Sequence, residues 1–203
     1  KLSSRLEGLA ACNAHAVFTL TSQLSTELQK RGVEKNRIYL LPNGGESGLS
    51  ESVAADKGLL AGLGLDPSVF TTGYAGAIKY YEGLDDLLVA MAQLRQDGRR
   101  IQAVIAGDGD WLPNLLSRCA DLNVGSCVRF TGKLSLAEAR RYLRASDMGV
   151  VPRKRLDVGE TVSPLKPFEF MTLGVPLLMS NVAPLLTIAE GSRQAVALFE
   201  ASN

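Results

Sequence analysis

Histidine and cysteine are scarce in this sequence: His15, Cys12, Cys119 and Cys127 are the only examples among 203 residues. So few nitrogen and sulfur ligands argue strongly against a zinc site, and we expect no metal. The odd number and irregular spacing of the cysteines argue against a disulfide framework and suit a reducing compartment. We expect three small buried thiols and a structural role for His15.

An excess of charge is also missing, because 22 Lys and Arg residues face 21 Asp and Glu residues. The chain as a whole therefore offers no field that would attract nucleic acid, and we expect no nucleic acid partner. No apolar run approaches the ~20 residues of a membrane-spanning helix. No signal peptide is visible, but the chain starts without methionine, so we expect the true N-terminus to lie elsewhere.

What the chain has is enough apolar character for a core, with 46% hydrophobic and 21% charged residues. Short apolar runs predict strands at residues 16–20, 37–41, 69–75, 101–106, 128–131, 148–151, 175–179 and 195–199. Helical spacing and capping signals predict helices at residues 22–31, 83–94, 111–122 and 165–173, a short helix at residues 54–63, and another helix that begins at Ser135. At this last helix, Glu138 lies three residues after Ser135 and completes a capping box.

The predicted strands are apolar on both faces and alternate with helices, which indicates a parallel sheet covered on both sides. The predicted fold is therefore α/β, a doubly wound Rossmann-like parallel sheet with helices on both faces. Ligands of such sheets bind beyond the carboxyl ends of the strands. The loops that begin at Gly73, Gly107, Gly132 and Pro152 are thus the candidate binding loops.

Two glycine-containing loops could bring backbone N–H groups close to a phosphate, at residues 73–76 and 107–109. Neither matches the dinucleotide-binding pattern of three spaced glycines. The P-loop pattern is also missing from the sequence. Taken singly, these loops are as well explained by ordinary strand-to-helix turns.

Residues 152–174 contain more polar and charged side chains that could bind a ligand. Three cations at 153–155 precede a loop with Glu160 and Ser163, and a helix with Lys166 and Glu169 follows. Lys166 and Glu169 are three residues apart and share a helix face. A cation at a helix N-terminus is unfavourable unless an anion lies nearby, which indicates a bound phosphate. Glu169 could then accept hydrogen bonds from a diol such as ribose. The alternative is a surface Lys–Glu pair of a few tenths of a kcal/mol.

Residues 163–180 closely resemble the donor-site signature of retaining glycosyltransferases of family 4, which have the GT-B fold. Further segments resemble that family in the same order, namely residues 19–22, 41–44, 73–76, 81–84, 107–109, 130–132 and 145–147. The resemblance covers nearly the whole chain. Each segment alone is unspecific, and it is their order and spacing that make the resemblance specific.

The resemblance implies that Glu169 holds the ribose hydroxyls, that Lys166 holds the diphosphate, and that the base lies against residues 132–134. Glu160 and Lys166 are the catalytic candidates that it indicates. The donor-binding candidates are Gly76, Ala77, Gly107, Gly132, Lys133, Leu134, Arg153, Ser163, Pro164, Leu165, Lys166 and Glu169.

The sequence departs from the family pattern at three positions. The first of the family's two glutamates would fall at position 161, which is threonine, with Glu160 directly before it. The family's phosphate-binding arginine would fall at Ala77 or Ile78, and its lysine falls at Glu82. Lys79 or the cations at 153–155 are candidates to replace these charges.

The resemblance implies three segments: residues 1–45, the end of an acceptor-binding domain; residues 46–68, a linker; and residues 69–203, a donor domain that we expect to be cut before its closing helices. The implied activity is metal-independent, retaining hexosyl transfer from a UDP- or GDP-linked sugar to a carbohydrate or lipid-linked acceptor, without a cofactor. We expect a cytoplasmic enzyme at or near the inner face of the membrane, contacting it through an N-terminal domain outside this chain. The fragment alone should catalyse little, because the reaction needs both domains.

Two other functions stay open. A nucleotide-sugar 2-epimerase has the same architecture but would bring histidines, and this chain has one. A non-catalytic nucleotide-sugar-binding or partner module is favoured by the missing phosphate-binding cations.

Overall fold

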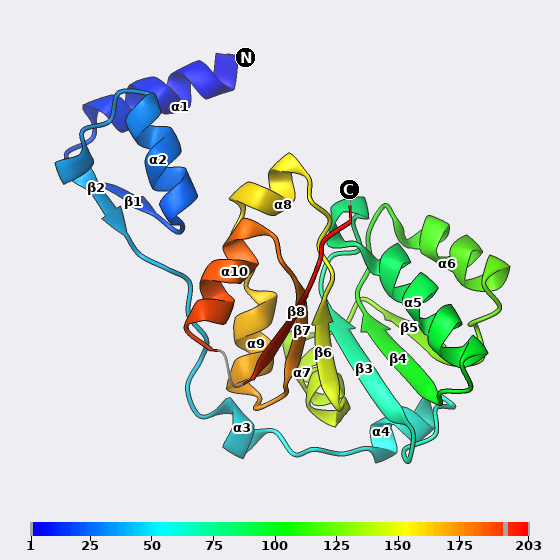
Figure 1. Cartoon of the computed structure of the whole chain (residues 1–203). Coiled ribbons are helices and arrows are strands. Elements are labelled where there is room, and N and C mark those ends of the chain that lie inside the picture. The colour runs from blue at the N-terminus through cyan, green and yellow to red at the C-terminus, as the bar shows by residue number, and fades with distance from the viewer. Residues whose placement is uncertain (1, 193–194, 203) are drawn as a thin grey trace.

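The central feature of the protein is a sheet of six parallel strands, seen in a computed structural model that describes residues 2–192 and 195–202 (Figure 1). The strand order is β5-β4-β3-β6-β7-β8. The strands are β3 (Phe70–Ala75), β4 (Ile101–Ala106), β5 (Val128–Gly132), β6 (Met148–Val151), β7 (Leu177–Ser180) and β8 (Val196–Phe199). Counted from β3, this is the Rossmann order 3-2-1-4-5-6, so the predicted doubly wound α/β fold is confirmed.

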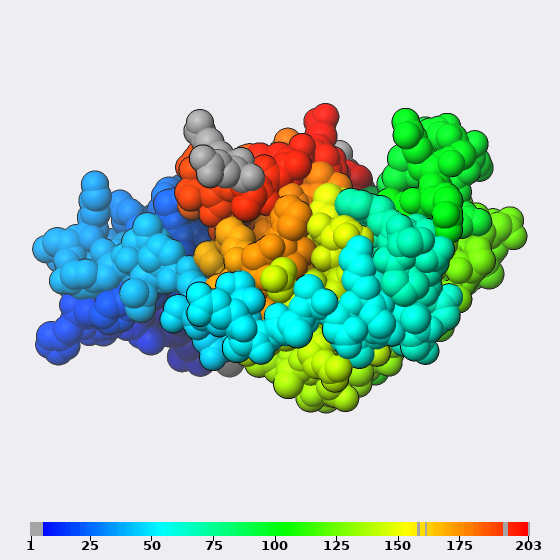
Figure 2. All heavy atoms as spheres, turned by 90° about the horizontal axis from the view of Figure 1, so that it is seen from below, coloured from blue at the N-terminus to red at the C-terminus, as the bar shows by residue number. Residues whose placement is uncertain are grey.

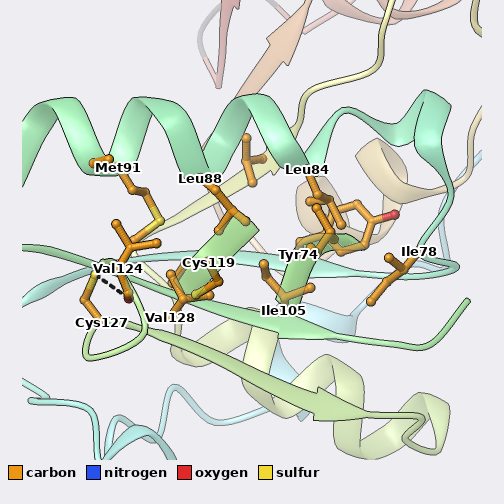
Figure 3. Close-up of a cluster of buried hydrophobic side chains, with 14 residues drawn as sticks. Tyr74, Ile78, Leu84, Leu88, Met91, Ile105, Cys119, Val124, Cys127 and Val128 are labelled. Atoms are coloured by element: carbon orange, nitrogen blue, oxygen red, sulfur yellow. Dashed lines mark hydrogen bonds between the residues drawn. The ribbon is translucent and has the colours of Figure 1, made fainter. Parts of the chain in front are cut away.

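Helices cover both faces of this sheet. The helices α5 (Leu84–Gln96) and α6 (Leu112–Asp121) cover one face, while α7 (Leu136–Ala145), α9 (Lys166–Thr172) and α10 (Ala183–Glu190) cover the other (Figure 1). Figure 3 shows the first of these layers, where Leu84 and Leu88 of α5 point toward the sheet residues Tyr74 and Ile105, and Met91 of α5 lies beside Val124.

The sequence of β4 explains why both faces are covered. Side chains alternate along a strand, so Ala103 and Ile105 belong to the core under α5 and α6, whereas Val104 belongs to a cluster on the opposite face. All three are buried, which matches the uninterrupted apolar run of the sequence.

The segment 46–68 lies across the end of the sheet at which the strands begin (Figure 1), and it is exposed on the face of the molecule seen in Figure 2. It holds two short helices, α3 (Leu49–Ser52) and α4 (Gly58–Gly62), in place of the single predicted helix at 54–63. Leu60 and Leu65 are buried against Val104 and Ala145. This segment therefore contributes to the core of the domain that follows it.

The N-terminal segment forms a separate small unit beside the main sheet (Figure 1). It consists of α1 (Leu2–Asn13), β1 (Val17–Thr19), α2 (Ser22–Lys30) and β2 (Ile38–Leu40), with β1 and β2 paired in parallel. Cys12 lies here, half-exposed, with its Sγ donating to the Arg31 carbonyl at 3.3 Å. The expectation of three buried thiols is thus wrong for Cys12, although Cys119 and Cys127 are buried and all three are free.

Most predicted elements are confirmed, with ends within a few residues of those expected. The capping box is present, because Ser135 Oγ accepts from the Glu138 N–H at 3.3 Å and the Glu138 carboxylate accepts from the Ser135 N–H at 3.0 Å. The helices α1, α8 (Asp157–Thr161) and α10 were not predicted. Within residues 2–192 and 195–202, no helix combines the length and apolar character needed to cross a membrane.

Candidate functional site

Two glycine loops extend the sheet beyond the carboxyl ends of its strands. The Gly76 N–H donates to the Ala106 carbonyl and the Gly107 N–H donates to the Gly132 carbonyl, both at 2.9 Å. Gly76 and Gly107 have φ values of +146° and +147°, which other residues rarely adopt. A Cβ atom on Gly107 would collide with the Gly76 carbonyl oxygen. These glycines therefore allow neighbouring loops to lie directly against each other.

A cavity of about 720 Å³ opens beyond these loops, and we call it the central cavity. Its floor is formed by the residues that follow β3, β4 and β5, and its walls by α7 and the start of α9. The lining residues are Ala75, Gly76, Ala77, Ala106, Gly107, Asp108, Gly109, Lys133, Leu134, Leu136, Ala139, Arg140, Leu143, Leu165, Lys166, Glu169 and Phe170. The volume and the position beside the switch in strand order, between β3 and β6, are typical of a small-molecule site.

Lys166, the first residue of α9, lines the central cavity but is already paired with an internal carboxylate. Its Nζ donates to Glu82 Oε1 at 2.8 Å and lies 5.4 Å from the centre of the Tyr74 ring. Burial lowers the pKa of the Lys166 ammonium below its usual value, and the Glu82 carboxylate opposes that shift. The anion that we expected near this cation is therefore present as Glu82.

Glu82 is almost completely buried and forms a second ion pair, with Arg153. Arg153 Nη2 lies 3.3 Å from the same Glu82 oxygen, and Arg153 Nη1 donates to the Val162 carbonyl at 2.8 Å. The pair is nearly inaccessible to solvent, with side chains 5% and 2% exposed. Arg153 is thus one member of a buried Arg153–Glu82–Lys166 cluster and does not line the central cavity.

Glu169 lies one turn after Lys166 and faces the same cavity, as their spacing predicted. Its two carboxylate oxygens accept from Arg140 on α7, Oε2 from Nε at 2.9 Å and Oε1 from Nη2 at 3.2 Å. Arg140 Nη2 also lies 3.0 Å from Glu46 Oε2. The hydrogen bonds to Glu169 are the main cause that raises the pKa of Arg140.

Several predicted site residues line the central cavity and others do not. Gly76, Ala77, Gly107, Lys133, Leu134, Leu165, Lys166 and Glu169 line it. Gly132 and Pro164 directly precede lining residues, and the Gly132 carbonyl supports Gly107. Ser163 contacts Asn43, whose Nδ2 donates to the Ser163 carbonyl at 3.3 Å.

Glu160, a catalytic candidate, lies on α8 and is engaged elsewhere. Its Oε2 accepts from the Ala183 N–H at the start of α10, at 2.9 Å. Glu160 is not among the residues that line the central cavity. The structure therefore assigns it a visible role as a cap of α10.

The remaining cations are also held by partners outside the central cavity. Lys154 is buried and pairs with Asp85 and Asp86 at 2.9 and 3.1 Å. Arg155 Nη2 donates to Asn181 Oδ1 at 2.8 Å. Lys79 forms an exposed pair with Asp110 at 2.8 Å. These side chains thus form ion pairs or hydrogen bonds with other residues of the protein, and they do not face the cavity as a phosphate-binding group would.

Sequence reasoning missed Arg140, which lines the central cavity, and it missed the pairing of Glu82 with Lys166. The capping box at Ser135 and the apolar Leu136 and Leu143 could have placed Arg140 on or near the inward face of its helix. No sequence signal links Arg140 to Glu169, because they are 29 residues apart on different helices.

The chain resembles known proteins along most of its length. It is 26% identical to the alpha-monoglucosyldiacylglycerol synthase of Streptococcus pneumoniae over 67% of this chain and 30% of that protein. It is 26% identical to the alpha-D-kanosaminyltransferase of Streptomyces kanamyceticus over 85% of this chain and 44% of that protein. The chain thus spans less than half the length of these curated relatives.

A solved structure shares the fold. HepE of Anabaena, crystallised in complex with UDP, superposes with a TM-score of 0.73 at 18% identity, over 95% of this chain and 52% of that one. Residues 69–203 match the model of the family described as glycosyl transferases group 1. Because this match includes all six strands and the loops and helices that line the central cavity, the chain belongs to the group 1 glycosyl transferases.

Proposed function

We propose that the central cavity binds a nucleoside diphosphate sugar and that the whole protein is a retaining, metal-independent hexosyltransferase of family 4. One observation carries the proposal. Lys166 and Glu169 face the same cavity at the carboxyl ends of three parallel strands, in a chain that belongs to the group 1 glycosyl transferases. A cation and a hydrogen-bond acceptor one helical turn apart match a diphosphate joined to a ribose.

The chemistry of the proposal depends on positioning and charge. Sugar transfer leaves a nucleoside diphosphate, whose negative charge grows as the bond to the sugar breaks. The Lys166 ammonium would stabilise that charge, and the backbone of Gly76 and Gly107 would let the phosphates approach closely. Lys133 and Leu134 would lie against the base.

We also propose a division of labour along the chain. Residues 1–45 would be the end of an acceptor-binding domain, residues 46–68 a connecting segment and residues 69–203 the donor domain. HepE was solved with UDP, which supports UDP as the first nucleotide to test. The names of the two curated relatives support a lipid-linked or carbohydrate acceptor. The free thiols are consistent with the cytoplasm as the proposed location.

The buried cluster gives a reason to keep a second candidate, a non-catalytic binding module. Glu82 already neutralises Lys166, and Glu160 lies outside the cavity. A site with less free positive charge should hold a diphosphate more weakly. Such a module would bind a nucleotide sugar and transfer nothing.

Calorimetric titration of the chain with UDP, GDP and ADP, with and without magnesium, tests the proposal. We expect saturable binding of one nucleotide, with the same affinity in magnesium and in EDTA. A folded sample that binds none of them would contradict the proposed donor site.

We expect Lys166→Ala and Glu169→Ala each to weaken binding of that nucleotide by about 1–3 kcal/mol, as hydrogen bonds to charged groups usually do. Lys30→Ala, which removes an exposed lysine from the end of α2, is the matched control and should bind as the wild type does. Wild-type affinity in both cavity variants would show that the nucleotide binds elsewhere.

A further inference from the structure

Arg140 holds two carboxylates and lies between two cavities. It lines the central cavity on one side and a smaller cavity of about 430 Å³ beside α3 on the other. Its side chain is only 14% exposed, so its contacts with Glu169 and Glu46 are partly withdrawn from water. The two-point contact with Glu169 fixes the plane of that carboxylate, because the guanidinium is a rigid fork.

The pairing leaves Glu169 able to accept further hydrogen bonds. A carboxylate has about four lone-pair directions, and Arg140 occupies one on each oxygen. The others remain for a pair of neighbouring hydroxyls. Without Arg140, the flexible Glu169 side chain would have to be ordered at the moment of binding, which opposes binding through lost rotamer freedom.

We propose that Arg140 is a positioning residue, which fixes the Glu169 carboxylate so that it recognises the two hydroxyls of a ribose. The inference rests on the proposed function, since it assumes a nucleotide in the central cavity. Arg140 acts through Glu169, so its loss affects the ligand that offers both hydroxyls. The affinity of a ligand that lacks the 2′-hydroxyl should fall less when Arg140 is replaced.

The test compares ribonucleotides with their 2′-deoxy forms. Affinities for UDP, 2′-deoxy-UDP, GDP and 2′-deoxy-GDP are measured for the wild type, Arg140→Met, Arg140→Lys and Glu169→Ala. We expect the wild type to prefer the ribose form of its nucleotide about tenfold, as one hydrogen bond to a charged group allows. Arg140→Met should reduce that preference to the value of Glu169→Ala, with the deoxy form changed less than about twofold.

Two variants, Arg140→Lys and Glu46→Gln, separate positioning from charge. Arg140→Lys keeps the charge without the fork, so its preference should lie between those of the wild type and Arg140→Met. Glu46→Gln removes the exposed partner of Arg140, and the preference should be retained because Glu46 is 63% exposed.

The outcomes distinguish the inference from the function on which it rests. A wild-type preference that persists in Arg140→Met overturns the inference alone. An equal loss for ribose and deoxyribose forms also overturns it, since Arg140 would then contact the ligand directly. A wild type that binds no nucleotide overturns the proposed function and the inference together.

Discussion

Replacing Gly107 by alanine should destabilise the protein by about 3 kcal/mol and abolish nucleotide binding in the central cavity. Gly107 has a φ of +147°, and strain of this kind costs on the order of 1–3 kcal/mol. Its new Cβ would also collide with the Gly76 carbonyl oxygen, a backbone atom that cannot move away without disturbing the pairing of β3 and β4. Relief of the collision would separate the two loops that form the floor of the cavity.

Urea unfolding followed by circular dichroism measures the first effect, and titration with the nucleotide measures the second. Gly125→Ala is the matched control, because a Cβ there meets no atom within 4 Å and Gly125 does not have a positive φ. The control should unfold and bind as the wild type does. A Gly107→Ala variant with wild-type stability would show that the loops are more adaptable than their geometry implies.

Replacing Glu82 by glutamine should be similarly damaging, with an expected loss of about 3–5 kcal/mol in the free energy of unfolding. The change removes the counter-charge shared by Arg153 and Lys166, whose side chains are only 5% and 16% exposed. Each cation would remain in a region of low dielectric without that carboxylate. Glu82 Oε2 is buried with no hydrogen-bond partner among the residues that the structure describes. The negative charge of Glu82 therefore contributes more to the stability of the cluster than the number of its hydrogen bonds does.

Asp110→Asn is the matched control for burial. It breaks the Lys79–Asp110 pair, which has the same 2.8 Å separation as Lys166–Glu82, but Asp110 is 72% exposed. Water and salt screen such a pair, so the free energy of unfolding should barely change. Equal effects of the two variants would contradict the view that burial makes the Glu82 cluster important.

The fold could be predicted from the sequence because its signals are local. The apolar run of β4, the glycines after the strands and the Ser135–Glu138 capping box each act within a few residues. Helix α10 was missed because its N-cap residue, Val182, has no side chain that could cap it and because the helix is apolar on most sides. Pro184 near its first turn was a signal that could have indicated it.

The candidate site was predicted only in part, because its partners are distant in sequence. Lys166 and Glu169 could be placed together by helical spacing. The pairing of Lys166 with Glu82 spans 84 residues, and only the folded sheet brings the two together. For the same reason the capping of α10 by Glu160, 23 residues away, could not be read from the sequence.

The strand order has a consequence for how the chain folds as it is made. The central strand β3 pairs with β6 across the middle of the sheet, and Asp147, just before β6, accepts from the Thr71 N–H at 2.8 Å across 76 residues. At the usual synthesis rate of 5–20 residues per second, β6 is synthesised roughly 4–15 s after β3. During that time one edge of an apolar strand is open to pairing with other chains. Nascent chains that end between β3 and β6 should therefore be the species most prone to aggregate and most dependent on chaperones.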